Sequence, residues 1–194
     1  MSESLQAIDT HIFYFLNTSA THPALDVVMP FLTDLNKQLF VKIFLVFFYA
    51  LVFWRGSNHL KIAMLLLIPA IFFSDQLSNI VKHYFERPRP CKIFADIHLL
   101  VPCGGGYSMP SSHAVNNFAG AVILSFFYSK YKKYFFVFAG IIAYSRVYVG
   151  VHYVSDLLIG AMIGIMCGNI ILAAWNKYFQ PKFFPQWKIH SSVQ

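Results

Sequence analysis

The chain has 194 residues, of which 57% are hydrophobic and only 12% charged. Soluble domains average roughly 45–50% apolar and about 25% charged residues, so this composition excludes a water-soluble globule, a disordered chain and a disulfide-dense secreted scaffold. The net charge of +7 suits an anionic membrane face or a phosphorylated ligand. A nucleic-acid ligand is disfavoured, because the sequence has no basic run interleaved with aromatic residues outside its apolar segments. We therefore expect one membrane-embedded domain over residues 1–194.

The first 36 residues are predicted to form an N-terminal amphipathic segment. Apolar residues recur there at helical spacing with Asp9 and His11 between them, a pattern typical of a helix at the membrane interface. The apolar residues are Leu5, Ile8, Ile12, Phe15 and Leu16. Within this segment, the stretch 23–35 is apolar but interrupted by two aspartates and a proline. It is interpreted as a sixth crossing, a re-entrant piece or an extension of the next helix.

Five further stretches approach the length of about 20 apolar residues that a spanning helix needs. They run over residues 39–54, 60–81, 114–128, 134–151 and 157–175. Several are short, so flanking polar residues such as Lys42 are expected to snorkel to the interface. The sequence thus predicts an all-α integral membrane bundle of five to six transmembrane helices with an N-terminal amphipathic helix.

The distribution of basic residues predicts the orientation of these helices. Lys and Arg in short loops favour the cytoplasmic side. Three regions alternate correctly for that side and carry Arg55, Lys61, Lys130, Lys132, Lys133, Lys177, Lys182 and Lys188. The loop over 82–113 and the turn over 146–156 then share the extracytoplasmic side, although both are basic. Two explanations are open: the preference of basic residues for the cytoplasmic side has an exception here, or these cations bind an anion.

Two further features concern the packing of the helices. Gly160, Gly164 and Gly168 form a small-residue stripe, which predicts the close approach of a neighbouring helix. Asp75, near the outer end of the second predicted span, is costly in lipid and is expected to face the protein interior or water. Both are interpreted as structural features.

Three clusters of polar residues fall in the two extracytoplasmic segments. In chain order they are Lys82 with Arg89 and Pro90, then Pro110, Ser111, Ser112 and His113, then Ser145, Arg146, His152 and Asp156. Taken singly, they are explained as interfacial anchors, a helix cap and a helix-end histidine paired with a carboxylate. Taken together, they supply what phosphoryl transfer without a metal requires, which is mainly positioning and charge neutralisation.

The cations and the helix start are predicted to hold phosphate. The guanidinium groups can grip oxygen atoms bidentately, and free N–H groups where a Gly-rich loop enters a helix attract phosphate. The hydroxyls of Ser111 and Ser145 can add donors. The predicted phosphate-binding residues are Lys82, Arg89, Ser111, Ser112 and Arg146.

The remaining polar groups suit acid–base and nucleophilic roles. His152 and Asp156 are four residues apart, so in a helix they share one face, and the carboxylate can hold one ring nitrogen while the other attacks phosphorus. His113 is suited to protonating the leaving oxygen. No carboxylate pair has the spacing of a hydrolytic metal centre, so neither a metal nor a cofactor is expected. Glu86 and Arg87 are interpreted as a loop ion pair that contributes little.

These clusters resemble the tripartite signature of the type 2 phosphatidic acid phosphatase family, whose members share a helical core and site with soluble vanadium haloperoxidases and bacterial acid phosphatases. That signature is Lys-x6-Arg-Pro, Pro-Ser-Gly-His and Ser-Arg-x5-His-x3-Asp, and the match covers residues 82–156. Ser112 stands where the family usually has Gly. A Ser adds a β-carbon and a hydroxyl at a position of close backbone approach.

The resemblance implies specific catalytic roles. His152 would form a phosphohistidine, Asp156 would orient it, and His113 would act as the general acid that later activates water. Phosphate binding would fall to Lys82, Arg89, Ser111 and Arg146.

Cys91 and Cys103 lie in the same extracytoplasmic loop, where oxidation is allowed. We expect a disulfide that tightens the loop carrying the phosphate-binding residues. The alternative is a pair of free thiols beside the membrane.

The leading hypothesis is a membrane lipid phosphatase of the bacterial inner membrane whose active site faces the periplasm. Phosphatidic acid, phosphatidylglycerol phosphate, a lipid A phosphate and undecaprenyl pyrophosphate all fit, and family habits favour the last, an undecaprenyl-diphosphatase activity. Two alternatives remain: a lipid phosphotransferase that uses the same site, and a protein that binds or transports lipid phosphate without chemistry. The oligomeric state is left open.

Overall fold

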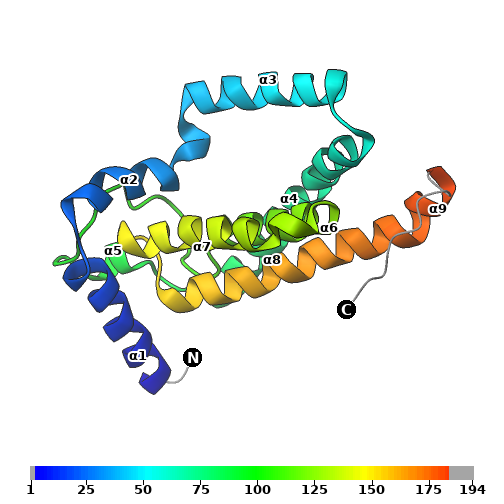
Figure 1. Cartoon of the computed structure of the whole chain (residues 1–194). Coiled ribbons are helices and arrows are strands. Elements are labelled where there is room, and N and C mark those ends of the chain that lie inside the picture. Colours follow the sequence, from blue (N-terminus) through cyan, green and yellow to red (C-terminus); the bar gives the residue numbers. More distant parts are fainter. Residues whose placement is uncertain (1–2, 184–194) are drawn as a thin grey trace.

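The computed structural model describes residues 3–183, so positions 1–2 and 184–194 of the expected domain, with Lys188, lie outside the described residues. Over residues 3–183 the regular structure is entirely helical (Figure 1), which confirms the predicted all-α class. The elements are α1 (Glu3–Tyr14), η1 (Phe15–Ser19), α2 (Pro23–Thr33), η2 (Leu35–Lys37), α3 (Leu39–Arg55), α4 (Asn58–Phe85), α5 (Pro90–Ile93), α6 (Ser112–Phe127), η3 (Ser129–Tyr131), α7 (Lys132–Tyr148), α8 (Val154–Ala174), η4 (Trp175–Phe179) and α9 (Gln180–Phe183).

Each of the five long apolar stretches forms one helix, namely α3, α4, α6, α7 and α8. Within residues 3–183, two helical stretches are long and apolar enough by themselves to cross a membrane, Asn58–Ile93 and Val154–Lys182. The helix α2 has 11 residues, which makes it about 16 Å long against a hydrocarbon core of about 30 Å. It is also separated from α3 by η2, so it is a short helix of its own and not an extension of α3.

The helix α6 lies at the centre of the bundle and packs against α4, α7 and α8 (Figure 1). The glycine stripe of α8 faces α6, as predicted. A β-carbon on Gly160 would lie 2.9 Å from the backbone oxygen of Ser111, and one on Gly168 would lie 2.8 Å from the Cβ of Val122. A β-carbon on Gly164 would collide with the backbone oxygen of Val115. The absence of side chains along this stripe therefore lets the two helices approach closely.

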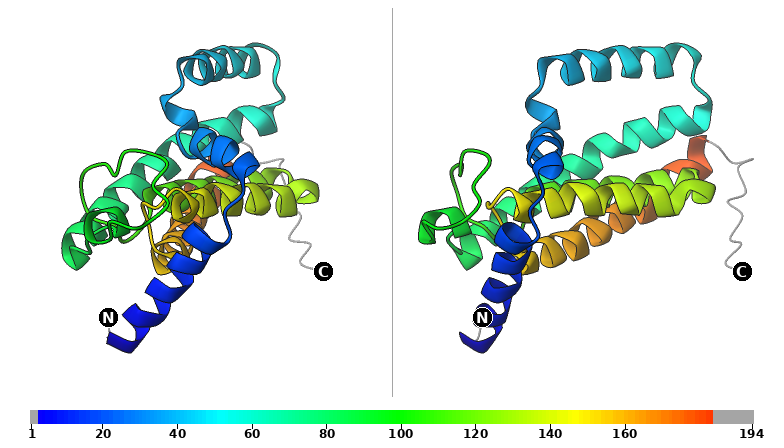
Figure 2. Two further views of the ribbon diagram at one scale, coloured as in Figure 1. Left: turned by 90° about the vertical axis from the view of Figure 1, so that its left-hand side faces the viewer. Right: turned by 60° about the vertical axis from the view of Figure 1, so that its left-hand side comes forward.

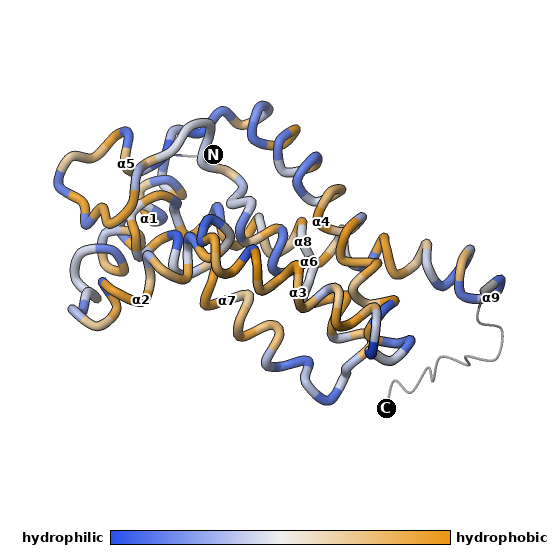
Figure 3. Tube along the Cα trace, turned by 90° about the horizontal axis from the view of Figure 1, so that it is seen from above, coloured by the Kyte–Doolittle hydropathy of each residue, from blue (hydrophilic) through white to orange (hydrophobic). Residues whose placement is uncertain are grey.

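The helix α3 runs beside the bundle and not within it (Figure 2). Its main packing partners are η2 and α4, and most of its large apolar side chains are exposed, among them Leu39, Phe40, Phe44, Val46, Phe47 and Trp54. Figure 3 shows hydrophobic residues along the helices of the bundle and hydrophilic residues at the turn between α6 and α7 and at α9. An apolar helix exposed in this way suits a lipid surrounding.

Three turns or short helices with basic residues gather at one end of the bundle. The α3–α4 turn, the α6–α7 turn and α9 lie together at one end, and they carry basic residues that include Arg55, Lys130 and Lys182 (Figures 1 and 2). The short helix α5, the end of α7 and the start of α8 lie at the other end. The chain thus separates its cationic turns from the segments that contain the three polar clusters.

The N-terminal segment is attached to this second end. On α1, Asp9 and Phe13 are buried, whereas Leu5, Ile8 and Ile12 remain exposed. In η1 the buried Asn17 donates from Nδ2 to the carbonyl of Tyr148 at 2.8 Å and to that of His98 at 3.0 Å, and its Oδ1 accepts from the His98 N–H. Asn17 thereby fastens the N-terminal segment to the end of α7 and to the loop after α5.

Because α6 and α8 approach closely, adding one methyl group between them should lower the stability of the protein. Gly164→Ala should lower the free energy of unfolding by about 1–3 kcal/mol, because the backbone of α6 must move away. Gly140→Ala on α7 is the matched control, because its β-carbon meets nothing within 4 Å; it should leave stability unchanged or raise it by up to about 1 kcal/mol. Equal unfolding curves for the two variants in detergent would contradict this packing.

Candidate active site

The three polar clusters come together at the end of the bundle that contains α5. The connecting loop is shorter than the predicted 82–113, because Lys82 belongs to α4 and both Ser112 and His113 belong to α6. The backbone N–H of Ser111 donates to the backbone oxygen of Asp156 at 3.0 Å. The start of α6 and the start of α8 are therefore bonded directly to each other.

His152 and Asp156 form a buried pair. The Nδ1 atom of His152 lies 3.3 Å from Oδ2 of Asp156, and the two residues are 1% and 0% exposed. The pair does not arise from a shared helical face, as the spacing suggested, because His152 precedes α8 while Asp156 lies in its first turn. The carboxylate instead caps α8 by accepting from the Tyr153 N–H at 2.9 Å. This cap places the imidazole against the carboxylate and leaves Nε2 as the ring nitrogen that Asp156 does not engage.

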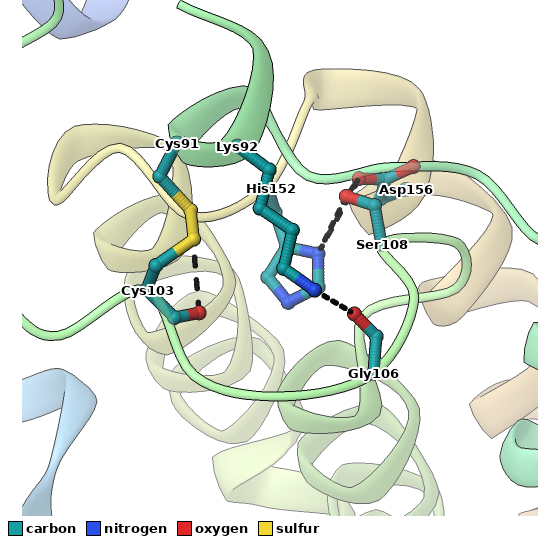
Figure 4. The surroundings of a disulfide bond; sticks show 7 residues. All are labelled: Cys91, Lys92, Cys103, Gly106, Ser108, His152 and Asp156. Carbon is teal, nitrogen blue, oxygen red and sulfur yellow. Dashed lines mark hydrogen bonds and ion pairs between the residues drawn. A yellow bond between two sulfur atoms is a disulfide. The ribbon is translucent and has the colours of Figure 1, made fainter. Parts of the chain in front are cut away.

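Ser108 completes this arrangement from the loop before α6. Its hydroxyl donates to Oδ2 of Asp156 at 2.5 Å and lies 3.4 Å from Nδ1 of His152 (Figure 4). Its backbone N–H donates to the Arg87 carbonyl at 2.7 Å. Sequence reasoning missed Ser108, because a lone serine two residues before a Pro-Ser motif has no spacing signal of its own.

Burial lowers the pKa of His152 from 6.5 to about 3. The hydrogen bond to Asp156 and the charge of that carboxylate act in the opposite direction, while the charges of Arg146 and Arg89 add to the lowering. The imidazole is therefore neutral at physiological pH, as a nucleophile requires.

Arg89 and Arg146 are buried cations, each 8% exposed. Lys82, Arg89 and Arg146 interact electrostatically, and their positive charges repel one another. Arg146 donates from Nη1 to the hydroxyl of the buried Thr33 at 2.6 Å, and Lys82 donates to the carbonyl of Tyr107 at 3.3 Å. The predicted cation cluster is thus assembled, with Thr33 of α2 as a partner that the motifs do not contain.

Several polar atoms around the cluster are buried without a hydrogen-bond partner among the described residues. They are Nε of Arg89, Nε of Arg146, Oγ of Ser111 and Nε2 of His113. A buried polar atom without a partner costs about 1–3 kcal/mol, so such atoms rarely accumulate in one place without a function. Three of these atoms belong to residues predicted to bind phosphate, and the fourth belongs to His113, the predicted general acid.

His113 lies in the first turn of α6, on the same side of the bundle as His152. Both imidazoles interact electrostatically with the guanidinium of Arg146. The two other serines have structural partners: Ser112 Oγ lies 2.9 Å from Ser78 Oγ on α4, and Ser145 Oγ donates to the Ile142 carbonyl at 2.7 Å. What Ser112 offers at this helix start is therefore its backbone N–H.

The predicted loop ion pair between Glu86 and Arg87 is wrong. Arg87 instead donates to Asp156 Oδ1 at 2.8 Å and to Asp9 Oδ2 at 2.7 Å, while Glu86 accepts from the Tyr107 hydroxyl at 2.8 Å. Adjacent residues cannot reveal a partner that lies far away in the sequence. Asp75, in contrast, faces the bundle as predicted and accepts from Asn116 at 2.8 Å.

Cys91 and Cys103 form a disulfide with a Cα–Cα distance of 5.8 Å (Figure 4). Next to it, Lys92 donates to the carbonyl of Gly106 at 3.3 Å. Both contacts join α5 to the later part of the loop between α5 and α6. The segment that contains Arg89 and Ser108 is thus held in place at both ends.

Within residues 3–183, no three His, Cys, Asp or Glu side chains gather in a way that could hold a metal ion. The three motifs contribute instead three cations, two imidazoles and one carboxylate to the site. Such a donor set suits an anion.

Residues 60–180 match the family model described as the PAP2 superfamily. The chain belongs to this superfamily. The resemblance to type 2 phosphatidic acid phosphatases that the motifs indicated is thereby confirmed.

Two PAP2 relatives are similar over most of their length. The lipid A 4′-phosphatase of Bacteroides thetaiotaomicron is 33% identical over 92% of this chain and 79% of its own. Phosphatidylglycerophosphatase B of Bacillus subtilis is 33% identical over 74% of this chain and 72% of its own.

Two solved structures share the PAP2 fold seen here. LpxE of Aquifex aeolicus has a TM-score of 0.69 at 32% identity, covering 86% of this chain and 95% of that one. The transmembrane PAP2-type phosphatidylglycerolphosphate phosphatase of Bacillus subtilis has a TM-score of 0.68 at 27% identity, covering 91% and 89%. Together these findings support a membrane-associated lipid phosphatase.

The lowered pKa of His152 predicts how stability depends on pH. Between pH 6.5 and about 3 the unfolded imidazole binds a proton that the folded one rejects, so the free energy of unfolding falls as the pH falls through this window. From pH 7 to pH 5 the loss due to this residue should be about 2 kcal/mol. The measurement compares wild type with His152→Gln in reversible micellar unfolding. Parallel pH dependences for the two proteins would mean that His152 is not buried in its neutral form.

Proposed function

We propose that the protein is a membrane phosphatase that removes phosphate from a lipid phosphate monoester or a lipid pyrophosphate through a phosphohistidine on His152. The observation that carries this proposal is the buried His152–Asp156 pair beside Arg89 and Arg146, whose Nε atoms have no partner among the described residues. A neutral imidazole oriented by a carboxylate and faced by cations is suited to attack a phosphorus atom.

In the first step the lone pair on Nε2 of His152 attacks phosphorus and forms a P–N bond. The bond from phosphorus to the lipid oxygen breaks, and this oxygen takes a proton from His113. The proton on Nδ1 of His152 stays directed at Asp156, so the carboxylate stabilises the positive charge that develops on the imidazole. The products of this step are the dephosphorylated lipid and the phosphohistidine.

In the second step a water oxygen attacks the same phosphorus atom. Its proton passes to His113, which has lost its own proton in the first step, and the P–N bond breaks. Inorganic phosphate leaves, and both histidines return to their starting protonation states.

The remaining residues hold the phosphoryl oxygens in both steps. Lys82, Arg89 and Arg146 neutralise the charge of the equatorial oxygens, while the Ser111 hydroxyl and the N–H groups at the start of α6 donate hydrogen bonds. These three cations supply the positive charge that a bound metal supplies in other phosphatases. We therefore propose a reaction that needs no metal and no cofactor.

We further propose that the site faces the extracytoplasmic side of a bacterial inner membrane. The disulfide lies at the site end, where an oxidising compartment permits it, and the basic turns lie at the other end. In this arrangement α3, α4, α6, α7 and α8 cross the bilayer as one domain, and α1 lies at the interface. Relatives named for lipid A, phosphatidylglycerophosphate and undecaprenyl diphosphate indicate the substrate class.

The direct test is the loss of turnover in His152→Gln and His113→Gln. Phosphate release from phosphatidic acid, phosphatidylglycerol phosphate and undecaprenyl pyrophosphate is measured in detergent micelles. Wild type should hydrolyse at least one of these lipids, and each variant should lose about a thousandfold or more in kcat, because each removes a group that acts in the transition state. His11→Gln, which removes an exposed histidine from α1, should keep wild-type turnover. Unchanged turnover in His152→Gln would exclude this mechanism.

A further inference from the structure

We infer that Asp9 and Arg87 are positioning residues for this reaction, which hold the Asp156 carboxylate in place and set the net charge opposite His152. The inference rests on the proposed function and extends it to a residue of the N-terminal helix. Neither residue is part of the three motifs, and Asp9 lies outside the 60–180 segment that matches the superfamily.

The guanidinium of Arg87 is held on several sides at once. Its Nη1 donates to Oδ1 of Asp156 at 2.8 Å and to Oγ of Ser155 at 2.7 Å, while its Nη2 donates to Oδ2 of Asp9 at 2.7 Å. Its Cζ lies 3.8 Å from the centroid of the Tyr153 ring. A fork fixed by two carboxylates and an aromatic face has little freedom to turn, so it holds the Asp156 carboxylate in one orientation.

Asp9 is the second fixed point of this arrangement. Its Oδ1 accepts from the backbone N–H of Ser155 at 3.0 Å, and its Oδ2 accepts from the Ser155 hydroxyl. The side chain of Asp9 is 7% exposed and that of Arg87 is 10% exposed, so water screens this pair poorly. Through Asp9, the amphipathic helix α1 bonds directly to the first turn of α8, next to Asp156.

The two carboxylate oxygens of Asp156 contact different groups. Oδ1 contacts Arg87, and Oδ2 contacts Ser108, the Tyr153 N–H and Nδ1 of His152. A lone Arg87 would neutralise the carboxylate and weaken its pull on the imidazole. With Asp9 present, two carboxylates share one guanidinium, so the cluster of Asp9, Arg87 and Asp156 has a net charge of −1, and its Asp156 carboxylate contacts His152. This charge stabilises the imidazole when it becomes positive on attacking phosphorus.

Asp9→Asn is the substitution that tests the effect of this charge on catalysis. The amide has the size of the carboxylate, and its one oxygen can still accept from the Ser155 N–H. Its NH2 group replaces the oxygen that accepts from Arg87, and the cluster loses its net charge. We expect kcat to fall by about tenfold, by analogy with the loss of groups that orient a functional histidine. KM should stay within about twofold, because Asp9 does not contact the phosphate-binding cations. Asp9→Glu, which restores the charge, should recover most of kcat.

A matched control separates positioning from the docking of α1. Asp96 accepts a hydrogen bond from the hydroxyl of Tyr14 on α1 at 2.8 Å but has no described contact with Asp156. Asp96→Asn therefore weakens a contact of the same helix, because an amide oxygen accepts less strongly than a carboxylate, without changing the charge beside the active site. It should keep wild-type kcat and KM.

The protonation of His152 provides a readout that a purely structural effect would not move. In wild type labelled with ¹⁵N-histidine, the His152 signal, assigned by its loss in His152→Gln, should report a proton on Nδ1. Arg87→Lys keeps the positive charge but loses the forked contact, so the carboxylate should become less fixed and the signal should shift toward a mixture of tautomers. In Asp9→Asn the Nδ1 signal should indicate a weaker hydrogen bond between His152 and Asp156.

The outcomes separate this inference from the proposed function. If wild type hydrolyses lipid phosphate and His152→Gln does not, while Asp9→Asn keeps wild-type kcat or Asp96→Asn loses as much as Asp9→Asn, the positioning role is excluded and the phosphatase stands. If His152→Gln itself keeps turnover, the proposed function fails first. A fall in kcat that is confined to Asp9→Asn and Arg87→Lys, recovered in Asp9→Glu and accompanied by the altered His152 signal, supports the inference.

Discussion

The carboxylate of Asp156 is buried at the point where α6 and α8 begin, and a buried charge is tolerated only when partners replace its lost hydration. Its oxygens contact Arg87, Ser108, the Tyr153 N–H and His152, while its backbone oxygen accepts from Ser111. One residue thereby joins the loop before α6, the turn between α7 and α8, and the first turn of α8. His152 and the starts of α6 and α8 are held together because they share this anchor.

The bundle supports a site that is unfavourable on its own. Arg89 and Arg146 are buried near each other and near Lys82, so their desolvation and mutual repulsion oppose folding. The close packing of the Gly164 stripe on α6 and the disulfide in the loop stabilise the surrounding structure. A phosphate group would meet cations already in position, so little reorganisation is left for the moment of reaction.

The sequence predicts the fold and the motif residues well, for a physical reason. Long apolar runs must be helices in lipid, and the three clusters match the spacing of a family signature. The partners of Arg87 are not predictable in this way, because Asp9 is 78 residues distant and only the folded chain brings them together. Likewise, the four-residue spacing of His152 and Asp156 suggested a shared helix, whereas the structure joins them through a helix cap. Thr33 and Ser108 carry no spacing signal at all.

The proposed mechanism requires His152 to become covalently phosphorylated during turnover. Its most direct test is rapid quenching of the enzyme with a lipid phosphate, followed by mass spectrometry of the denatured protein under alkaline conditions, where phosphohistidine survives. An acid-labile phosphate is expected on the peptide that contains His152, and it should form and decay at least as fast as overall turnover. Turnover without any phosphorylated histidine, together with inversion of configuration at a chiral phosphorus, would contradict it.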